Sequence, residues 1–174
     1  TGTATLDPTD DNVYEGDETA VIDISGVSGK SGVTENSTQQ VSVTISENES
    51  EPTVTLATSA TSIAENAGTS LTLTATLSVA TTADVTVALS TSGTATEGTD
   101  YTDGSGNIDD IVISAGSTTG TVSFTPTDDS LYDATSNETA TIAISGVSGG
   151  SASESGTQSV TITITDNESA PTVT

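Results

Sequence analysis

Apolar and polar residues alternate along most of this chain. Residues 70–78, for example, read SLTLTATLS, so that leucine or alanine occupies every second place. A period of two is typical of strands with one buried and one exposed face. The pattern predicts seven short strands, at 54–57, 70–78, 84–90, 110–114, 121–126, 139–145 and 159–165.

The segments between these strands are turns rich in Gly, Ser and Asp, and no segment shows a helical period. Seven short strands with such turns predict an all-β chain, folded as a seven-stranded antiparallel immunoglobulin-like β-sandwich. Disorder is the alternative, because high net charge and a low aromatic content of 2% are its signature. The regular alternation argues against disorder.

Two parts of the chain repeat each other at an offset of about 119 residues. TGTATLDPTDDNVYEGDETAVIDISGVSG at 1–29 matches TGTVSFTPTDDSLYDATSNETATIAISGVSG at 119–149, and TQQVSVTISENESEPTVT at 38–55 matches TQSVTITITDNESAPTVT at 157–174. We therefore predict tandem sandwich repeats. Residues 1–52 would be the C-terminal half of a preceding repeat with its last three strands, 53–170 a complete repeat, and 171–174 the start of the next.

The half-repeat at 1–52 leaves the inward faces of its strands without partners. Two interpretations stay open. The chain is a slice of a longer array of repeats, in which contacts between copies in an oligomer or filament are also allowed. Alternatively, strands from another molecule complete the half-repeat, as in donor-strand filaments. We favour the slice.

Charge narrows the range of partners. The chain has 25 acidic residues and a single basic one, Lys30, which gives a net charge of −24. Nucleic acids and anionic membranes would repel such a chain. No apolar stretch approaches the roughly 18 residues that span a membrane, so we expect no membrane insertion in this segment. With no cysteine, disulfides cannot support the thin core.

Most of the acidic residues of the complete repeat are predicted to gather at one end of the sandwich. Successive strands run in opposite directions, so the loops at 58–69, 91–109 and 127–138 meet the chain that leaves residue 165. We call this end the acidic pole. Twelve of the 14 acidic residues between 53 and 170 fall there: Glu65, Glu97, Asp100, Asp103, Asp109, Asp110, Asp128, Asp129, Asp133, Glu138, Asp166 and Glu168.

Carboxylates gathered at one end of the sandwich repel one another, and a bound cation would relieve this repulsion. Two carboxylates about 4 Å apart repel by roughly 1 kcal/mol in water and about 4 kcal/mol at the effective dielectric of a protein surface. Acidic loops often serve only solubility, but here four segments converge, and no basic residue lies among them. Oxygen ligands without His or Cys select a hard ion, and flexible loops favour Ca²⁺ over the strictly octahedral Mg²⁺.

Four motifs along the complete repeat resemble those of the Calx-beta domain family: AENAG at 64–68, GTATEGTDYT at 93–102, TDDSLYDATSNE at 127–138 and TDNE at 165–168. The family includes calcium-sensing domains of sodium/calcium exchangers and tandem repeats of large bacterial surface proteins. The resemblance implies a seven-stranded sandwich that binds Ca²⁺ at one pole.

The resemblance also implies which residues would hold the ions. In the complete repeat these are Glu65, Asp100, Asp128, Asp129, Asp166 and Glu168. The half-repeat has counterparts at Asp10, Asp11, Glu47 and Glu49. Beyond the resemblance, Asp103, with Asp109 and Asp110, offers further oxygens from the loop that follows residue 91. Ser92 and Asn167 stand where the family often has acidic residues. This site would therefore hold fewer ions than the sensor domain of an exchanger, or hold them more weakly.

Nothing in the sequence indicates catalysis. Without His or Cys the usual nucleophilic triads are unavailable, and the aromatic platforms of a sugar cleft are missing beside the paired carboxylates. We expect no enzyme. The expected function is that of a calcium-binding structural repeat in a long extracellular or cell-surface protein, such as an adhesin stalk, a filament or a surface-layer component.

In that role Ca²⁺ would stiffen the junctions with neighbouring repeats of the same chain. The alternative is a calcium-sensing regulatory domain of a larger membrane or signalling protein.

Overall fold

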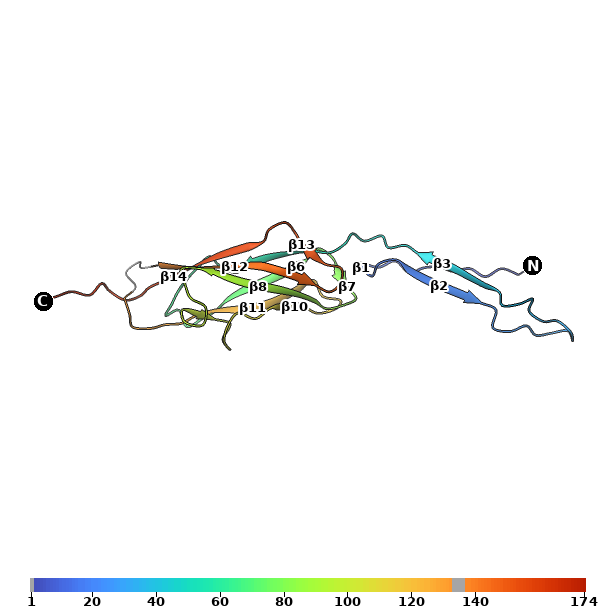
Figure 1. Cartoon of the computed structure of the whole chain (residues 1–174), viewed down its shortest axis with the longest axis horizontal. Helices are drawn as coiled ribbons and strands as arrows, with labels where there is room; N and C mark the ends of the chain where they lie inside the picture. The colour runs from blue at the N-terminus through green and yellow to red at the C-terminus, as the bar shows by residue number, and fades with distance from the viewer. Residues whose placement is uncertain (1, 133–136) are drawn as a thin grey trace.

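The chain forms a β-hairpin and a β-sandwich that lie end to end (Figure 1). The computed structural model describes residues 2–132 and 137–174. The N-terminal part contains β1 (Val13–Tyr14), β2 (Glu18–Asp23) and β3 (Gln40–Ile45). Among the described residues there is no helix that is long and apolar enough to cross a membrane.

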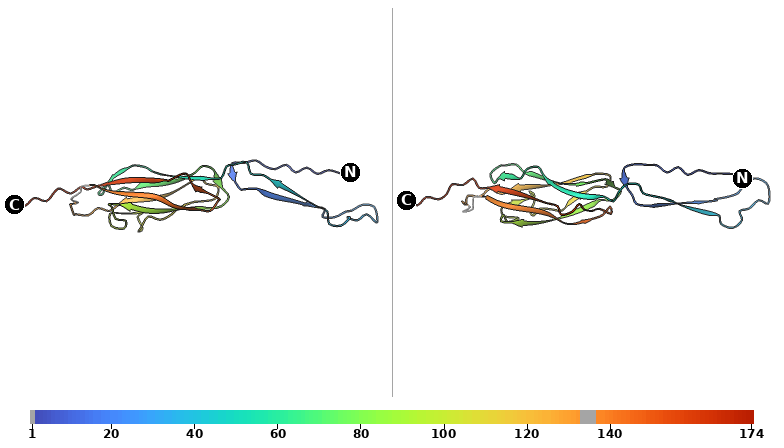
Figure 2. Two further views of the ribbon diagram at one scale, coloured as in Figure 1. Left: turned by 45° about the horizontal axis from the view of Figure 1, so that its top comes forward. Right: turned by 90° about the horizontal axis from the view of Figure 1, so that it is seen from above.

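The sandwich consists of two five-stranded sheets (Figure 2). The first sheet has the order β10 (Ile111–Ile113), β8 (Val85–Gly93), β12 (Asn137–Ser148), β14 (Ser159–Thr165) and β5 (Ser62–Ala64). The second has the order β13 (Ser153–Glu154), β4 (Thr53–Thr58), β6 (Leu71–Leu77), β11 (Thr119–Pro126) and β9 (Tyr101–Thr102). All seven predicted strands are present, as β4, β6, β8, β10, β11, β12 and β14, and the predicted sandwich is confirmed.

The sequence pattern did not reveal the short strands β5, β7 (Ala80–Thr81), β9 and β13. Two of them bring parallel pairing into a sandwich that was predicted as antiparallel, because β5 runs parallel to β14 and β13 runs parallel to β4. The chain crosses from one sheet to the other between β4 and β5. After this crossing, β5 lies at the edge of the first sheet, beside β14, the last strand of the complete repeat.

The core lies between the two sheets and is built from the alternating apolar residues. Leu73, Ile142 and Ile162 are fully buried, and burying such a side chain stabilises the fold by about 1.5–3 kcal/mol. The two large aromatic side chains of the core, Tyr101 and Phe124, stack with ring centroids 4.7 Å apart. Tyr101 comes from β9 and Phe124 from β11, which pair as antiparallel neighbours in the second sheet.

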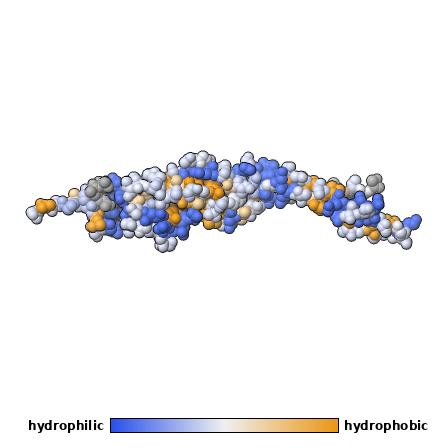
Figure 3. Space-filling model, viewed as in Figure 1, coloured by the Kyte–Doolittle hydropathy of each residue, from blue (hydrophilic) through white to orange (hydrophobic). Residues whose placement is uncertain are grey.

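The hairpin of β2 and β3 has the same register as β12 and β14. Ile22 lies opposite Val41, as its counterpart Ile142 lies opposite Val160. The surroundings differ, however: Ile22 is 44% exposed, whereas Ile142 is fully buried. Figure 3 shows apolar residues on the surface in this part of the molecule. The hairpin is thus folded like the end of a sandwich whose other strands do not cover it in this structure.

A short pairing joins the hairpin to the sandwich. β1 runs parallel to β7, with Val13 opposite Ala80 and Tyr14 opposite Thr81. Thr81 is 1% exposed, so β7 is anchored firmly in the sandwich. The loop of the half-repeat that contains Asp10 and Asp11 therefore ends directly on the sandwich that follows it.

Candidate metal centre at the acidic pole

Glu65 is positioned by the edge pairing of β5 with β14. The backbone N–H of Glu65 donates to the carbonyl of Thr165 (3.1 Å), and the Oε1 of Glu65 accepts from the N–H of Asn167 (3.0 Å). Glu65 is only 8% exposed although it is acidic. The first strand crossing and the exit from the last strand are thus joined at this side chain.

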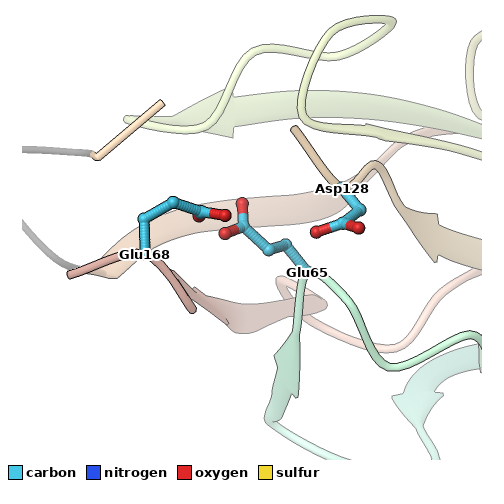
Figure 4. Close-up of side chains that lie close together, drawn as sticks. All are labelled: Glu65, Asp128 and Glu168. Atoms are coloured by element: carbon cyan, nitrogen blue, oxygen red, sulfur yellow. The ribbon is translucent and has the colours of Figure 1, made fainter. Parts of the chain in front are cut away.

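Glu65, Asp128 and Glu168 come together at the end of the sandwich (Figure 4). They belong to three different segments: the residue after β5, the loop after β11 and the exit from β14. One carboxylate oxygen from each lies within 4.8 Å of the others. Figure 4 shows the Glu65 carboxylate between the other two. The predicted convergence of these loops at one pole is therefore seen in the structure.

Glu168 carries the clearest sign of crowded carboxylates. Its Oε2 atom is buried and has no hydrogen-bond partner among the described residues. The carboxylates of Asp166, first, and Glu65 raise the pKa of Glu168 to about 7, because two carboxylates can share a hydrogen bond only when one of them holds a proton. At neutral pH this position therefore attracts a proton or another cation.

A small cavity of about 50 Å³ lies at the same pole. Its lining includes Asp100, Asp129 and Asp166 from the predicted ligand set, and its full lining is Glu65, Asp100, Thr127, Asp129, Glu138, Ile164 and Asp166. Thr127 was not predicted. Glu138 was placed at this pole but not among the ligands. In the sequence, Glu138 directly precedes the predicted strand at 139–145. In the structure it lies opposite Ile164, next to the exit from the last strand.

Asp100 is held in place by a close backbone contact that requires glycine. Gly93 has φ +122°, and a Cβ at this residue would lie 2.0 Å from the carbonyl oxygen of Thr139. The N–H groups of Thr94 and Ala95 both donate to that same carbonyl (2.9 and 3.0 Å). The loop that follows is thereby fixed to β12, and the Asp100 carboxylate accepts from the N–H of Thr96 (2.6 Å).

Asp103 does not line the cavity, unlike Asp100, the other predicted ligand from its loop. Its Oδ1 accepts hydrogen bonds from the N–H of Ser105 (2.6 Å), the N–H of Gly106 (3.0 Å) and the Ser105 hydroxyl (2.8 Å). The bond from the Ser105 backbone, above all, lowers the pKa of Asp103. Asp103 therefore closes its own turn in this structure. Asp110 is also turned away, because its carboxylate accepts from the N–H of Leu89 (3.1 Å). Asp133 lies outside the described residues.

The four predicted ligands of the half-repeat line one cavity of about 330 Å³: Asp10, Asp11, Glu47 and Glu49. Their carboxylates do not form a close group like that of Glu65, Asp128 and Glu168. Glu47 accepts backbone hydrogen bonds from Glu15, Gly16, Asn48 and Glu49. These bonds, that from Glu15 first, lower the pKa of Glu47 to about 2. The shared hydrogen bond with Glu47 raises the pKa of Glu49, so the pattern at Asp166 and Glu168 recurs here.

The donor set fits a calcium ion. Ca²⁺–oxygen distances are about 2.3–2.6 Å, so two oxygens on one ion lie at most about 5 Å apart. The oxygens of Glu65, Asp128 and Glu168 meet this limit as they stand. All of these donors are oxygens, and the chain has neither His nor Cys. An ion would also satisfy the buried Oε2 of Glu168.

The fold and the site together define an immunoglobulin-like sandwich with an acidic end. The sequence profile of the Calx-beta domain matches residues 47–168. The chain belongs to the Calx-beta domain family, and the resemblance seen in its motifs is confirmed.

Solved structures support the same fold. The crystal structure of the apo form of the Calx CBD1 domain matches with a TM-score of 0.52 and 18% identity, covering 67% of this chain and 99% of that one. The crystal structure of CBD12 from CALX1.2 matches with a TM-score of 0.51 and 19% identity, covering 64% of this chain and 44% of that one. No match was found among curated protein sequences.

Proposed function

We propose that this chain is a calcium-binding structural segment of a long extracellular or cell-surface protein, such as an adhesin stalk, a filament or a surface-layer component. Its partners would be neighbouring repeats of the same kind. Ca²⁺ at the acidic pole would neutralise the crowded carboxylates and stiffen the junction with the next repeat. We propose no catalytic role.

The observation that carries this proposal is the contact of three carboxylates at one pole without a basic partner. Lys30, the single basic residue, lies in the loop between β2 and β3. The pKa of Glu168, raised to about 7, indicates that the site gains from a positive charge at neutral pH. Glu65, Asp128 and Glu168 would hold the ion, and Asp100, Asp129 and Asp166 lie near enough to extend the ligand set.

The repetition of the acidic exit favours a structural role over a sensor. The chain contains two closely similar copies of the acidic exit, SENESEPTVT and TDNESAPTVT. An array of similar sites suits a spacer, whereas a sensor needs one tuned site. Extracellular calcium modules bind at about 10⁻⁴–10⁻³ M, and we expect an affinity in this range.

Calorimetric titration with Ca²⁺ tests the proposal directly. We expect binding at about 10⁻⁴–10⁻³ M to the wild-type chain and at least about a tenfold loss of affinity in Glu65→Gln. Gln keeps the oxygen that accepts from Asn167, so this variant removes the charge and preserves the hydrogen bond. Mg²⁺ should bind more weakly than Ca²⁺.

The matched control is Asp84→Asn at the opposite pole. The Asp84 carboxylate accepts from the N–H of Ala115 (2.8 Å), and Asn retains an acceptor for this bond. Calcium binding should be unchanged in this variant. Equal affinities in wild type and Glu65→Gln, or no heat of binding up to 10-fold above the expected range, would overturn the proposed site.

A further inference from the structure

The segment of the half-repeat that contains Asp10 and Asp11 continues directly into β1. Asp10 and Asp11 lie in the candidate ion site of that half-repeat, and two residues later β1 pairs with β7 of the following sandwich. The pairing joins the acidic end of one unit to the opposite end of the next. The two acidic residues of the complete repeat that strand direction does not place at the acidic pole, Asp84 and Glu154, belong to that opposite end. With so few acidic residues there, the two ends meet with little repulsion.

The acidic residues themselves shape this docking strand. The Asp11 carboxylate accepts from the N–H of Val13 (2.8 Å), and the Glu47 carboxylate accepts from the N–H of Gly16 (2.8 Å), just past β1. These bonds fix the backbone on both sides of the paired residues. β1 is therefore set in its docking conformation by side chains that were predicted as ion ligands.

The complete repeat has a segment that corresponds to β1, but no described strand pairs with that segment in this structure. Leu131 and Tyr132 are the counterparts of Val13 and Tyr14. The Asp129 carboxylate accepts from the N–H of Leu131 (2.6 Å), as Asp11 does for Val13. Leu131 is 71% exposed and Tyr132 37% exposed, whereas Val13 and Tyr14 are half-buried against the sandwich.

We propose that Leu131–Tyr132 is a docking strand for the Ala80–Thr81 edge of another Calx-beta sandwich. This inference rests on the proposed structural role, and it names the surface through which one repeat holds the next. The occupant is a sandwich of the same kind, because this chain already shows that contact once, between β1 and β7. The segment PTVT at 171–174 repeats PTVT at 52–55, which enters β4, so the exit from the complete repeat can enter a further sandwich in the same way.

Burial supports the same occupant. Val54 in the first PTVT is fully buried in its sandwich, whereas Val173 in the second is fully exposed. An apolar side chain left in water loses about 1.5–3 kcal/mol compared with the buried state. In the proposed arrangement the next sandwich would cover Leu131 as the present one half-covers Val13, and would bury Val173 as the present one buries Val54.

The test is a disulfide trap in an extended chain. Residues 56–174 of a second copy are joined directly after Thr174. Because 171–174 are identical to 52–55, this fusion repeats the entry sequence of β4 at the new junction. Leu131→Cys is combined with Ala80→Cys in the second sandwich. Opposite residues on paired strands have Cα atoms about 5 Å apart, which suits a disulfide, and the chain has no other cysteine.

Two controls make the result decisive. Val13→Cys with Ala80→Cys in the single chain reproduces the pairing already seen and should oxidise readily. Leu131→Cys with Ser105→Cys in the second sandwich places the second thiol in an exposed turn at the acidic pole, the end of the sandwich opposite β7. We expect the Leu131–Ala80 pair to cross-link at least about tenfold faster than the Leu131–Ser105 pair. Equal rates for the two pairs, or failure of the Val13–Ala80 pair, would overturn the docking strand.

Calcium calorimetry on the same extended chain separates this inference from the proposed function. If calcium binds and the Leu131–Ala80 pair shows no preference, only the docking strand is wrong. If calcium does not bind and the pair cross-links selectively, the docking strand stands without the ion. We expect both to hold, with faster selective cross-linking in Ca²⁺ than in EDTA.

Discussion

Glu65 and Asn167 are 102 residues apart in the sequence and are joined by a hydrogen bond of 3.0 Å, in which the Asn167 N–H donates to Glu65 Oε1. The bond connects the chain just after β5 to the exit from β14. Because Glu65 also lies within the three-carboxylate cluster, the candidate ion site closes only when β5 is paired with β14. Binding of an ion at this site would therefore be coupled to folding of the sandwich.

Glu168→Gln should have opposite effects with and without calcium. In EDTA the variant should melt a few degrees higher than wild type, because one charge of the crowded cluster is gone. In 5 mM Ca²⁺ it should melt lower, because a ligand is lost. Thermal unfolding followed by circular dichroism measures both. Glu154→Gln at the other pole should show neither effect. If Glu168→Gln shifted the melting temperature in the same direction in both buffers, the result would contradict a crowded carboxylate cluster that binds calcium.

The stability of the metal-free protein should depend on pH through Glu168. Its pKa is raised in the folded protein from the ordinary 4.5 to about 7. Protonation therefore favours the folded state: this contribution is fully present below pH 4.5 and is lost as the pH rises through about 7. In EDTA, the urea concentration at the midpoint of unfolding should decrease as the pH is raised from 5.5 to 8.

The comparison with Glu168→Gln isolates this group from the other acidic residues, since Gln does not titrate. The variant should lose most of the change in midpoint between pH 5.5 and pH 8. Calcium should reverse the trend in wild type, because protons compete with the ion for the same oxygens. Parallel pH profiles of the wild type and the variant in EDTA would show that Glu168 does not carry the effect.

Gly93→Ala should destabilise the sandwich by about 3 kcal/mol or more. The residue has φ +122°, and the added Cβ would collide with the Thr139 carbonyl. The same change should weaken calcium binding, because it moves the loop that positions Asp100. Gly106→Ala is the control, since a Cβ there meets nothing within 4 Å and φ lies outside the positive range. Chemical denaturation of both variants compares them.

Ile22 and Ile142 offer a matched test of what covers each hairpin. Ile142→Ala should cost about 2–5 kcal/mol because the side chain is fully buried. Ile22→Ala, at the same register in the hairpin, should cost less than about 0.5 kcal/mol because the side chain is 44% exposed. Similar losses in the two variants, measured by urea unfolding, would mean that another surface covers the hairpin in solution.

The main strands could be predicted because each has a clear alternation of apolar and polar residues. β5, β7, β9 and β13 have only two or three residues each, too few to show a period. β5 contributes a single buried apolar residue, Ile63. Its parallel pairing with β14 depends on tertiary contacts across 102 residues, which no local pattern reveals.

The candidate site was predictable at the level of loops and less so at the level of side chains. Strand direction alone placed Glu65, Asp128 and Glu168 at one pole, and they meet there. It could not show that Asp103 closes its own turn, because short Asp side chains also bond to nearby backbone N–H groups. That choice depends on the local conformation of DGSGN at 103–107, where glycine allows several turns.

Only one residue, Asn12, separates Asp11 from Val13, which pairs with Ala80 of the neighbouring sandwich. So short a connection leaves no slack between the carboxylate and the docking strand. Tension applied to the two termini would pass through this point and load the acidic residues directly. With an ion held there, the force needed to pull the two parts from each other should rise with the calcium concentration.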